Sequence, residues 1–250
     1  MGLLDNESIP RRKMILFFVI DTSGSMLGSK IGSVNDAIEN VLPMIGEISD
    51  ENPDAEINVA ALEFSTGTRW LYDEPKDAKE FIWQKVEADG LTSLGEACIE
   101  LNKKLSRSGG FMPTSTGSGY YAPAIILLSD GGPTDNFEGG LKVLQGNSWY
   151  KSAIKVAIAI GDDADKNVLK QFTGSSEAVI TVHNIDALKT MIRIIAITSS
   201  QIGSKSSTAT DSTKQDQVVE EINKQAADVD GAETAAAPKP AAGDSYDEWD

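Results

Sequence analysis

Hydrophobic residues in this chain gather in five short and almost uninterrupted runs. The runs cover residues 14–20, 57–64, 124–129, 154–160 and 178–182. Apolar residues are continuous within each run and do not alternate with polar ones, which predicts strands buried on both faces. Such strands are typical of a parallel sheet that helices cover on both sides.

Helical spacing of apolar residues appears between these runs, over residues 31–45, 94–105 and 188–195. The alternation of strand and helix predicts an α/β fold: an open, doubly wound, mainly parallel sheet with helices on both faces. Residues 69–73 predict one further strand, joined to 57–64 through the short connection 65–68. So short a connection permits only an antiparallel hairpin, and the sheet should therefore carry one antiparallel edge strand.

The domain organisation follows from composition. Residues 13–202 predict one domain, preceded by an N-terminal arm at 1–12. Residues 203–250 contain few large apolar residues and hold four lysines against eleven acids. This acidic tail is predicted to be disordered, except for a short helix that carries Val218, Val219 and Ile222.

Charge and cysteine content exclude several classes of protein. The net charge of −16 offers no basic face for nucleic acid or for an anionic membrane. The single cysteine excludes an internal disulfide and a cysteine-based zinc site, which favours a reducing compartment. Residues 14–20 follow three basic residues, but the run is short and ends in Asp21, so we interpret it as a core strand and not as a signal peptide. We expect a cytoplasmic protein that does not enter the membrane.

The segment Asp21-Thr22-Ser23-Gly24-Ser25 ends the first apolar run. It places three oxygen-bearing side chains at alternate positions, and oxygen is the ligand that Mg²⁺ prefers. Ligands of open α/β sheets bind at the carboxyl ends of the strands, where this segment lies. The alternative is that Ser23 or Ser25 only caps the helix that follows.

Two distant segments favour the metal interpretation. Thr92 lies just before a predicted helix, and Asp130 ends the predicted strand 124–129, before Gly131 and Gly132. With these segments the chain resembles the von Willebrand factor A domain family over roughly residues 13–202. The metal-ion-dependent adhesion site (MIDAS) of that family combines an Asp-x-Ser-x-Ser loop with a distant Thr and a distant Asp, in the same order along the chain.

This resemblance implies a site made of Asp21, Ser23, Ser25, Thr92 and Asp130. The three hydroxyls would contact the cation directly, whereas the two carboxylates would act mostly through bound water. The expected cation is Mg²⁺, with Mn²⁺ or Ca²⁺ as alternatives. In the family an Asp or Glu carboxylate of a partner protein fills the coordination position left open.

Three segments, 18–26, 92–97 and 128–135, further resemble the bacterial tellurium-resistance TerY-like group within that family. The resemblance implies a non-enzymatic adaptor in an intracellular stress-response or defence system. Its partners would be a kinase or a phosphatase. A separate alternative is a recruiting subunit of a ring-forming ATPase, which shares the metal site and differs only in its partner. The chain lacks the zinc-binding extension that some members of the group carry.

An enzyme is the competing interpretation. Phosphohydrolases of the haloacid-dehalogenase type also place an Asp after a buried strand and use Mg²⁺. They need a second Asp two residues further on, where this chain has Ser23. The chain also has no Gly-x-x-x-x-Gly-Lys-Ser/Thr nucleotide loop.

The remaining candidates have simpler interpretations. Asp135 is expected to cap the helix that follows it, the alternative being the outer shell of the metal, and residues 161–165 are expected to form a turn and a helix cap. Cys98 is expected to be a buried, inert thiol, and His183, the only histidine, to be structural. Glu63 and Ser65 are outer-shell candidates without a motif. The Gly- and Ser-rich residues 109–121 predict a loop, which either borders the ligand crevice or is a plain surface connection.

Residues 244–250, Asp-Ser-Tyr-Asp-Glu-Trp-Asp, join two aromatic residues to four acids. An aromatic anchor beside a carboxylate suits docking as a short peptide. We therefore hypothesise that the acidic tail binds the open metal position, in its own molecule or in a neighbouring one. The alternative is that the tail only keeps the chain soluble.

Overall fold

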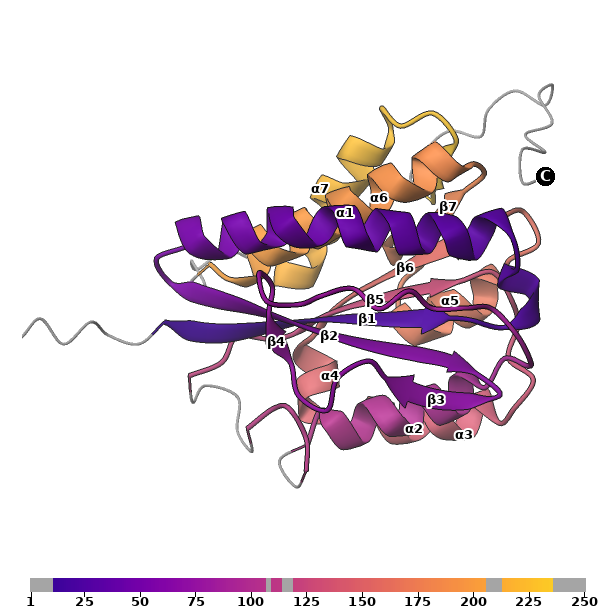
Figure 1. The fold of residues 1–250 in the computed structure, drawn as a ribbon, viewed down its shortest axis with the longest axis horizontal. Coiled ribbons are helices and arrows are strands. Elements are labelled where there is room, and N and C mark those ends of the chain that lie inside the picture. The colour runs from indigo at the N-terminus through magenta and orange to yellow at the C-terminus, as the bar shows by residue number, and fades with distance from the viewer. Residues whose placement is uncertain (1–10, 107–108, 114–118, 206–212, 236–250) are drawn as a thin grey trace, which may run out of the picture.

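A computed structural model describes residues 11–106, 109–113, 119–205 and 213–235 of the chain. At its centre lies a mixed sheet with strand order β3-β2-β1-β5-β6-β7-β8, and β4 also pairs with β2 (Figure 1). The strands are β1 (Arg12–Asp21), β2 (Ala55–Ser65), β3 (Gly67–Trp70), β4 (Lys76–Asp77), β5 (Ala124–Ser129), β6 (Ile154–Ile160), β7 (Val179–Val182) and β8 (Ala232–Thr234). The α-helices are α1 (Ser29–Glu51), α2 (Leu94–Lys104), α3 (Phe137–Gln145), α4 (Ser148–Ser152), α5 (Lys166–Thr173), α6 (Ile185–Gly203) and α7 (Lys214–Ala226), and two short 3₁₀ turns are η1 (Gly24–Met26) and η2 (Ser176–Ala178).

The predicted α/β fold and its parallel strands are confirmed. Each of the five apolar runs lies in one of β1, β2, β5, β6 and β7, which pair in parallel. The predicted antiparallel edge strand is also present, as β3, although it begins earlier than expected. Ser65 pairs with Gly67, so a single residue makes the turn, and Gly67 adopts a φ of 110°, which favours glycine.

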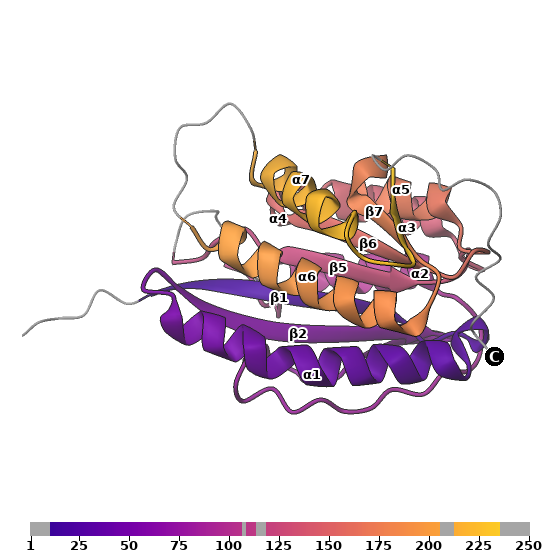
Figure 2. The same cartoon turned by 90° about the horizontal axis from the view of Figure 1, so that it is seen from above.

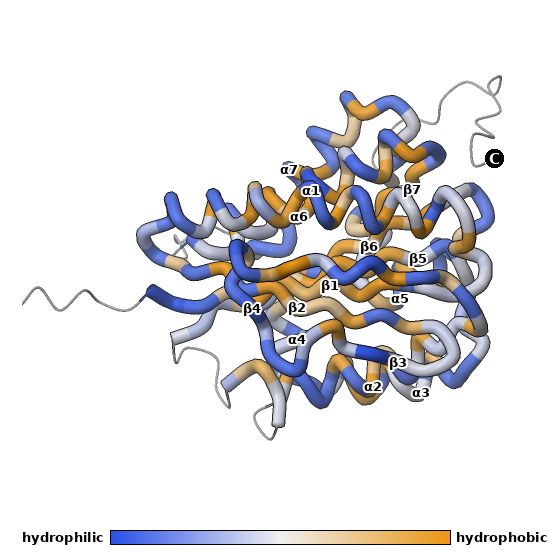
Figure 3. Tube along the Cα trace, viewed as in Figure 1, coloured by the Kyte–Doolittle hydropathy of each residue, from blue (hydrophilic) through white to orange (hydrophobic). Residues whose placement is uncertain are grey.

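Helices cover both faces of the sheet and create two hydrophobic clusters. Met14, Leu16 and Phe18 of β1 belong to the cluster beneath α1, α6 and α7, whereas its alternate residues Ile15 and Phe17 belong to the cluster beneath α2, α3, α4 and α5 (Figures 1 and 2). Figure 3 shows the hydrophobic residues concentrated along the central strands. In the ranges that the structure describes, none of the helices has the apolar length that a bilayer span requires.

The prediction of a disordered tail is wrong for residues 213–235. The expected short helix is present as α7, and it buries Val218, Val219 and Ile222 against the α6 side of the sheet. After α7 the chain adds β8 to the sheet, antiparallel to β7, with Val182 opposite Ala232. Residues 213–235 thus fold onto the domain through two features: the apolar stripe of the otherwise polar helix α7, and the edge of β7 that accepts β8. Residues 206–212 and 236–250 lie outside the described residues. Residues 1–10 of the predicted N-terminal arm also lie outside them, and Arg12, which was placed in the arm, is the first residue of β1.

The loop at residues 109–121 does not border the ligand crevice in its described part. The Lys13 amide donates to the carbonyl of Gly119 at 2.8 Å, and the Arg12 guanidinium donates to the carbonyl of Tyr120 at 2.6 Å. These contacts lie at the amino end of β1, whereas the crevice lies at its carboxyl end. The alternative interpretation, a plain surface connection, agrees with this position.

Candidate metal centre

Asp21 lies at the carboxyl end of β1 and is fully buried. One of its carboxylate oxygens accepts from the Ser23 amide at 2.9 Å, and the other accepts from the Ser129 hydroxyl at 2.6 Å. Burial raises the pKa of Asp21, because a charged group loses its hydration; the nearby Asp130 also raises it, and the two serines lower it in part. A nearby cation would relieve this electrostatic cost.

Thr22 and Gly24 of the 21–25 loop bond to neighbouring segments, whereas the hydroxyls of Ser23 and Ser25 face each other. The Thr22 hydroxyl donates to the Phe64 carbonyl at 3.1 Å, and the Gly24 amide donates to the Gly90 carbonyl at 3.1 Å. These two bonds fix the loop to its neighbours. The hydroxyl oxygens of Ser23 and Ser25 lie 3.1 Å apart.

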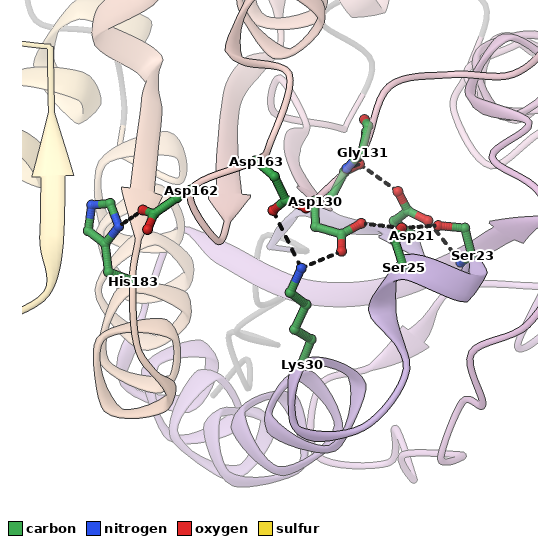
Figure 4. A network of polar contacts seen from close by, with 10 residues as sticks. Asp21, Ser23, Ser25, Lys30, Asp130, Gly131, Asp162, Asp163 and His183 are labelled. Carbon is green, nitrogen blue, oxygen red and sulfur yellow. Dashed lines mark hydrogen bonds and ion pairs between the residues drawn. The ribbon is translucent and has the colours of Figure 1, made fainter. Parts of the chain in front are cut away.

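Asp130 follows β5, the neighbour of β1, and therefore reaches the same edge of the sheet. One of its oxygens accepts from the Ser25 hydroxyl at 2.7 Å, and the other accepts from the Lys30 ammonium at 2.7 Å (Figure 4). The Asp130 side chain is 0% exposed and that of Lys30 is 14% exposed. Lys30 also lies 3.6 Å from Asp163, which is exposed.

Thr92 is buried beside this cluster, on the segment that precedes α2. The segment is held against the 21–25 loop by the Gly24–Gly90 bond and by the Asp89 amide, which donates to the Thr22 carbonyl at 2.8 Å. Thr134 holds it from the other side, accepting from the Thr92 amide at 3.1 Å. Hydrogen bonds thus connect Asp21, Ser23, Ser25 and Asp130, and Ser129 joins them through Asp21. The segment that carries Thr92 is bound to the same loop, at the carboxyl end of β1.

The spacing of these oxygens suits a small divalent cation. In an octahedron with metal–oxygen distances of about 2.1 Å, adjacent ligands lie about 3 Å apart. The Ser23–Ser25 hydroxyl oxygen separation is 3.1 Å, close to that value. Within the described ranges no three His, Cys, Asp or Glu side chains form a metal-binding group, so hydroxyls must complete any ligand set. The site therefore fits a hard cation such as Mg²⁺ better than a soft one.

The helix-cap alternative for the two serines does not hold. The cap of α1 is Gly28, and Ser23, which precedes η1, makes no side-chain cap bond. Asp135 was predicted to cap the helix that follows it, but α3 is capped by Asn136. Asp135 instead accepts from the amides of Gly95 and Glu96, at 2.9 and 2.8 Å, and so caps the neighbouring helix α2.

The other predicted candidates have structural surroundings. Asp165 caps α5 as predicted, since it accepts from the Asn167 and Val168 amides. Cys98 lies on the buried face of α2, and burial raises the pKa of its thiol far above the usual range, which agrees with an inert residue. His183 contacts Asp162 and lies 3.5 Å from Glu233 of β8.

Glu63 and Ser65 lie at the end of β2, where β2 pairs with the edge strand β3. Arg69 of β3 donates to the Glu63 carboxylate at 2.5 Å, across the hairpin that joins β2 and β3. The Ser65 carbonyl accepts from the Ser93 amide at 2.9 Å, which ties the end of β2 to the segment before α2. The Glu63 carboxylate thus pairs across the hairpin, and the backbone of Ser65 holds the neighbouring loop.

Sequence reasoning missed Ser129 and Lys30. Ser129 directly precedes Asp130, so its position at a strand end was the available signal. Lys30 has no such signal, because only the fold brings the first turn of α1 against the end of β5. Together they supply a hydroxyl donor to Asp21 and a positive charge to Asp130.

Comparison with known proteins supports the family suggested by the motifs. A family model described as the von Willebrand factor type A domain matches residues 16–194. The inter-alpha-trypsin inhibitor heavy chain H2 of Mus musculus is 28% identical over 188 residues, which cover 69% of this chain and 18% of that protein. The inter alpha-trypsin inhibitor heavy chain 4 of the same species is 29% identical over 137 residues, which cover 51% of this chain and 13% of that protein. The chain thus spans less than a fifth of the length of these relatives.

Similar solved structures share the fold at low sequence identity. The pilus adhesin SpaC from Lactobacillus rhamnosus GG, in its open conformation, superposes with a TM-score of 0.59 at 15% identity, covering 77% of this chain and 30% of that one. Proximal thread matrix protein 1 from the mussel byssus, described with a zinc-occupied MIDAS motif, has a TM-score of 0.54 at 14% identity, covering 75% of this chain and 48% of that one. The ArnB paralog VWA2 from Sulfolobus acidocaldarius has a TM-score of 0.52 at 19% identity, covering 72% of this chain and 44% of that one.

Proposed function

The chain belongs to the von Willebrand factor type A domain family, and from that premise we propose that it is a non-enzymatic protein-interaction module that depends on a divalent cation. The observation that carries the proposal is the convergence of the Ser23 and Ser25 hydroxyls, 3.1 Å apart, beside the buried carboxylates of Asp21 and Asp130. A cluster of this kind suits the holding of an ion. A cysteine nucleophile is disfavoured, because Cys98 is buried and burial raises the pKa of its thiol.

Each residue of the site has a distinct role in this proposal. The hydroxyls of Ser23, Ser25 and Thr92 hold the cation directly, and the carboxylates of Asp21 and Asp130 supply negative charge through bound water. Ser129 orients Asp21 through its 2.6 Å hydrogen bond. When bound, the cation offers an open coordination position to an Asp or Glu carboxylate of a partner protein.

We propose Mg²⁺ as the cation, with Mn²⁺ or Ca²⁺ as alternatives. Hydroxyl and carboxylate oxygens favour these hard ions. The zinc-occupied MIDAS motif described for the mussel protein supports a divalent cation at the corresponding place and adds Zn²⁺ to the ions to be compared.

The biological setting is a proposal on the sequence segments alone. Their resemblance to the tellurium-resistance TerY-like group supports a cytoplasmic adaptor in a bacterial stress-response or defence system. A kinase, a phosphatase or a ring ATPase would then supply the acidic partner residue. Capture of partners from a lysate, with and without a chelator, tests both the partner class and its dependence on metal.

Calorimetry tests the metal site directly. Titration with Mg²⁺, Mn²⁺, Ca²⁺ and Zn²⁺ should show one binding event in the natural chain and none in Asp21→Ala or Thr92→Ala. Asp50→Ala is the matched control, since Asp50 is an exposed acid that pairs with Lys79 on the surface. Binding retained in both site variants would refute the assignment, and magnesium-dependent phosphatase turnover that Asp21→Ala abolishes would favour the enzyme interpretation.

A further inference from the structure

Two exposed leucines flank the candidate metal centre. Leu27 is 63% exposed and follows η1, which carries Ser25; Leu91 is 58% exposed and directly precedes Thr92. The two loops touch, because the Gly24 amide donates to the Gly90 carbonyl at 3.1 Å; Leu27 belongs to the same turn as Gly24, whose carbonyl accepts from the Leu27 amide at 3.3 Å. Single exposed leucines are common on proteins, but two on the loops that carry metal ligands indicate a contact surface.

The chemistry of this surface defines what it can bind. The cation position takes a carboxylate, and the leucines take a large apolar side chain next to that carboxylate. Few interface residues supply most of the binding energy, and aromatic anchors are prominent among them. The best ligand is therefore a short segment in which an acid and an aromatic residue are neighbours.

Residues 244–250 of this chain have that composition. Tyr246 and Trp249 enclose Asp247 and Glu248, so each of these two acids has an aromatic neighbour. Bound at this surface, one of the two carboxylates would satisfy the cation while an aromatic ring would cover the leucines. The remaining acids of residues 244–250 are repelled by the negative charge of the protein. The contact therefore depends on the high local concentration that attachment to the same chain provides.

The position of β8 makes the reach sufficient. β8 starts opposite Val182, at the edge that carries the site, and runs antiparallel to β7, so that Thr234 lies opposite Ile180, two residues back from that edge; β7, β6 and β5 separate β8 from β1. Four strand spacings of about 4.8 Å amount to about 19 Å across that edge. The residues from 235 to 247 can span about 40 Å when extended, at about 3.3 Å per residue. A tether of this length gives an effective concentration of about a millimolar, enough to populate a weak contact.

We propose that Leu27, Leu91 and the cation position form a docking surface for residues 244–250 of the same chain. The proposal rests on the proposed function, since the cation supplies the charge that the carboxylate needs. It makes the segment a competitor of any acidic partner protein. An external partner must then carry an acid beside an apolar residue and must displace the segment.

Paramagnetic broadening by Mn²⁺ in the full-length chain tests the proposal. Mn²⁺ broadens the amide signals of nearby residues, whereas Mg²⁺ does not. We expect Mn²⁺ to broaden the signals of Thr92 and of residues 244–250. The double variant Leu27→Ser/Leu91→Ser should restore most of the intensity of residues 244–250 and leave Thr92 broadened. Val143→Ser is the matched control, because Val143 is 50% exposed but lies in the last turn of α3.

The outcomes separate the two proposals. Broadening of Thr92 without residues 244–250 overturns the docking surface and leaves the metal site intact. Absence of broadening at both places overturns both. If Val143→Ser also restores the signal intensity of residues 244–250, the leucines have no specific role. If the broadening of these residues fades on dilution, the contact is with a second copy, which contradicts the same-chain proposal. Trp249→Ser should act like the leucine variant, and an unchanged pattern in that variant contradicts the aromatic anchor.

Discussion

At the scale of single residues, Lys30 changes the charge of the candidate site. Its ammonium lies 2.7 Å from Asp130, whose other oxygen already accepts from Ser25. The formal charges of Asp21, Asp130 and Lys30 sum to −1. A bound divalent cation would therefore give these three residues and the cation a net charge of +1. Lys30 should therefore weaken cation binding and strengthen the attraction for an acidic ligand.

Lys30→Met should separate these two effects. Methionine keeps the apolar stem but removes the charge, so we expect the affinity for Mg²⁺ to rise by about tenfold, or about 1.4 kcal/mol. We expect the affinity for an acidic partner to fall at saturating Mg²⁺. Calorimetry gives the first value and binding of the captured partner the second. Lys79→Met, at a surface pair with Asp50, is the control, and changes of the same sign in both affinities would contradict this role.

At the scale of elements, the sequence was most informative where a segment's own pattern decides its structure. The continuous apolar run of β1 predicts a strand because helices cover both of its faces. The helix α7 is harder to predict, since only Val218, Val219, Ile222 and Ala226 are buried in it and its surroundings are polar. β8 has no strand pattern at all; its hydrogen bonds to the free edge of β7 decide its conformation.

The same division applies to the residues of the site. Asp21, Ser23 and Ser25 lie within one turn, so their alternation can be recognised locally. Asp130 can be recognised at the end of a predicted strand, whereas Thr92 is linked to the site only by the family pattern. Lys30 depends on where α1 packs, and Asp135 on the close contact of α2 with α3, so neither contact can be derived from local spacing.

The cap at α2 distinguishes a structural role of Asp135 from a role in metal binding. Asp135 accepts two amide hydrogen bonds from the first turn of α2, so Asp135→Ala should lower the free energy of unfolding by about 1–2 kcal/mol. Mg²⁺ affinity should remain unchanged. Denaturant unfolding and calorimetry measure the two quantities, and Asp165→Ala is the matched control because Asp165 caps α5. A loss of Mg²⁺ affinity in Asp135→Ala alone would place Asp135 in the outer shell of the cation.

At the scale of the whole molecule, the net charge of −16 acts on every cation in solution. The long-range field raises the local concentration of divalent ions around the entire surface, and salt screens it over about 10 Å at 0.1 M. The proposed site would act differently, because its converging oxygens would hold one ion at one position. The two contributions to metal binding should therefore differ in their dependence on salt.

Thermal unfolding with Mg²⁺ can separate the field from the site. A ligand that binds only the folded state stabilises it by about 2.7 kcal/mol at a concentration of 100 times its Kd. We expect this stabilisation in the natural chain at both low and moderate NaCl, reduced but not abolished by salt. In Asp21→Ala only the salt-sensitive part should remain, since that variant keeps most of the negative charge but loses the carboxylate at the centre of the site. Melting curves at matched ionic strength provide the measurement. If salt removes the stabilisation equally in the natural chain and in Asp21→Ala, Mg²⁺ binds only through the long-range field of the negative charge. A specific site requires a part of the stabilisation that is lost in Asp21→Ala.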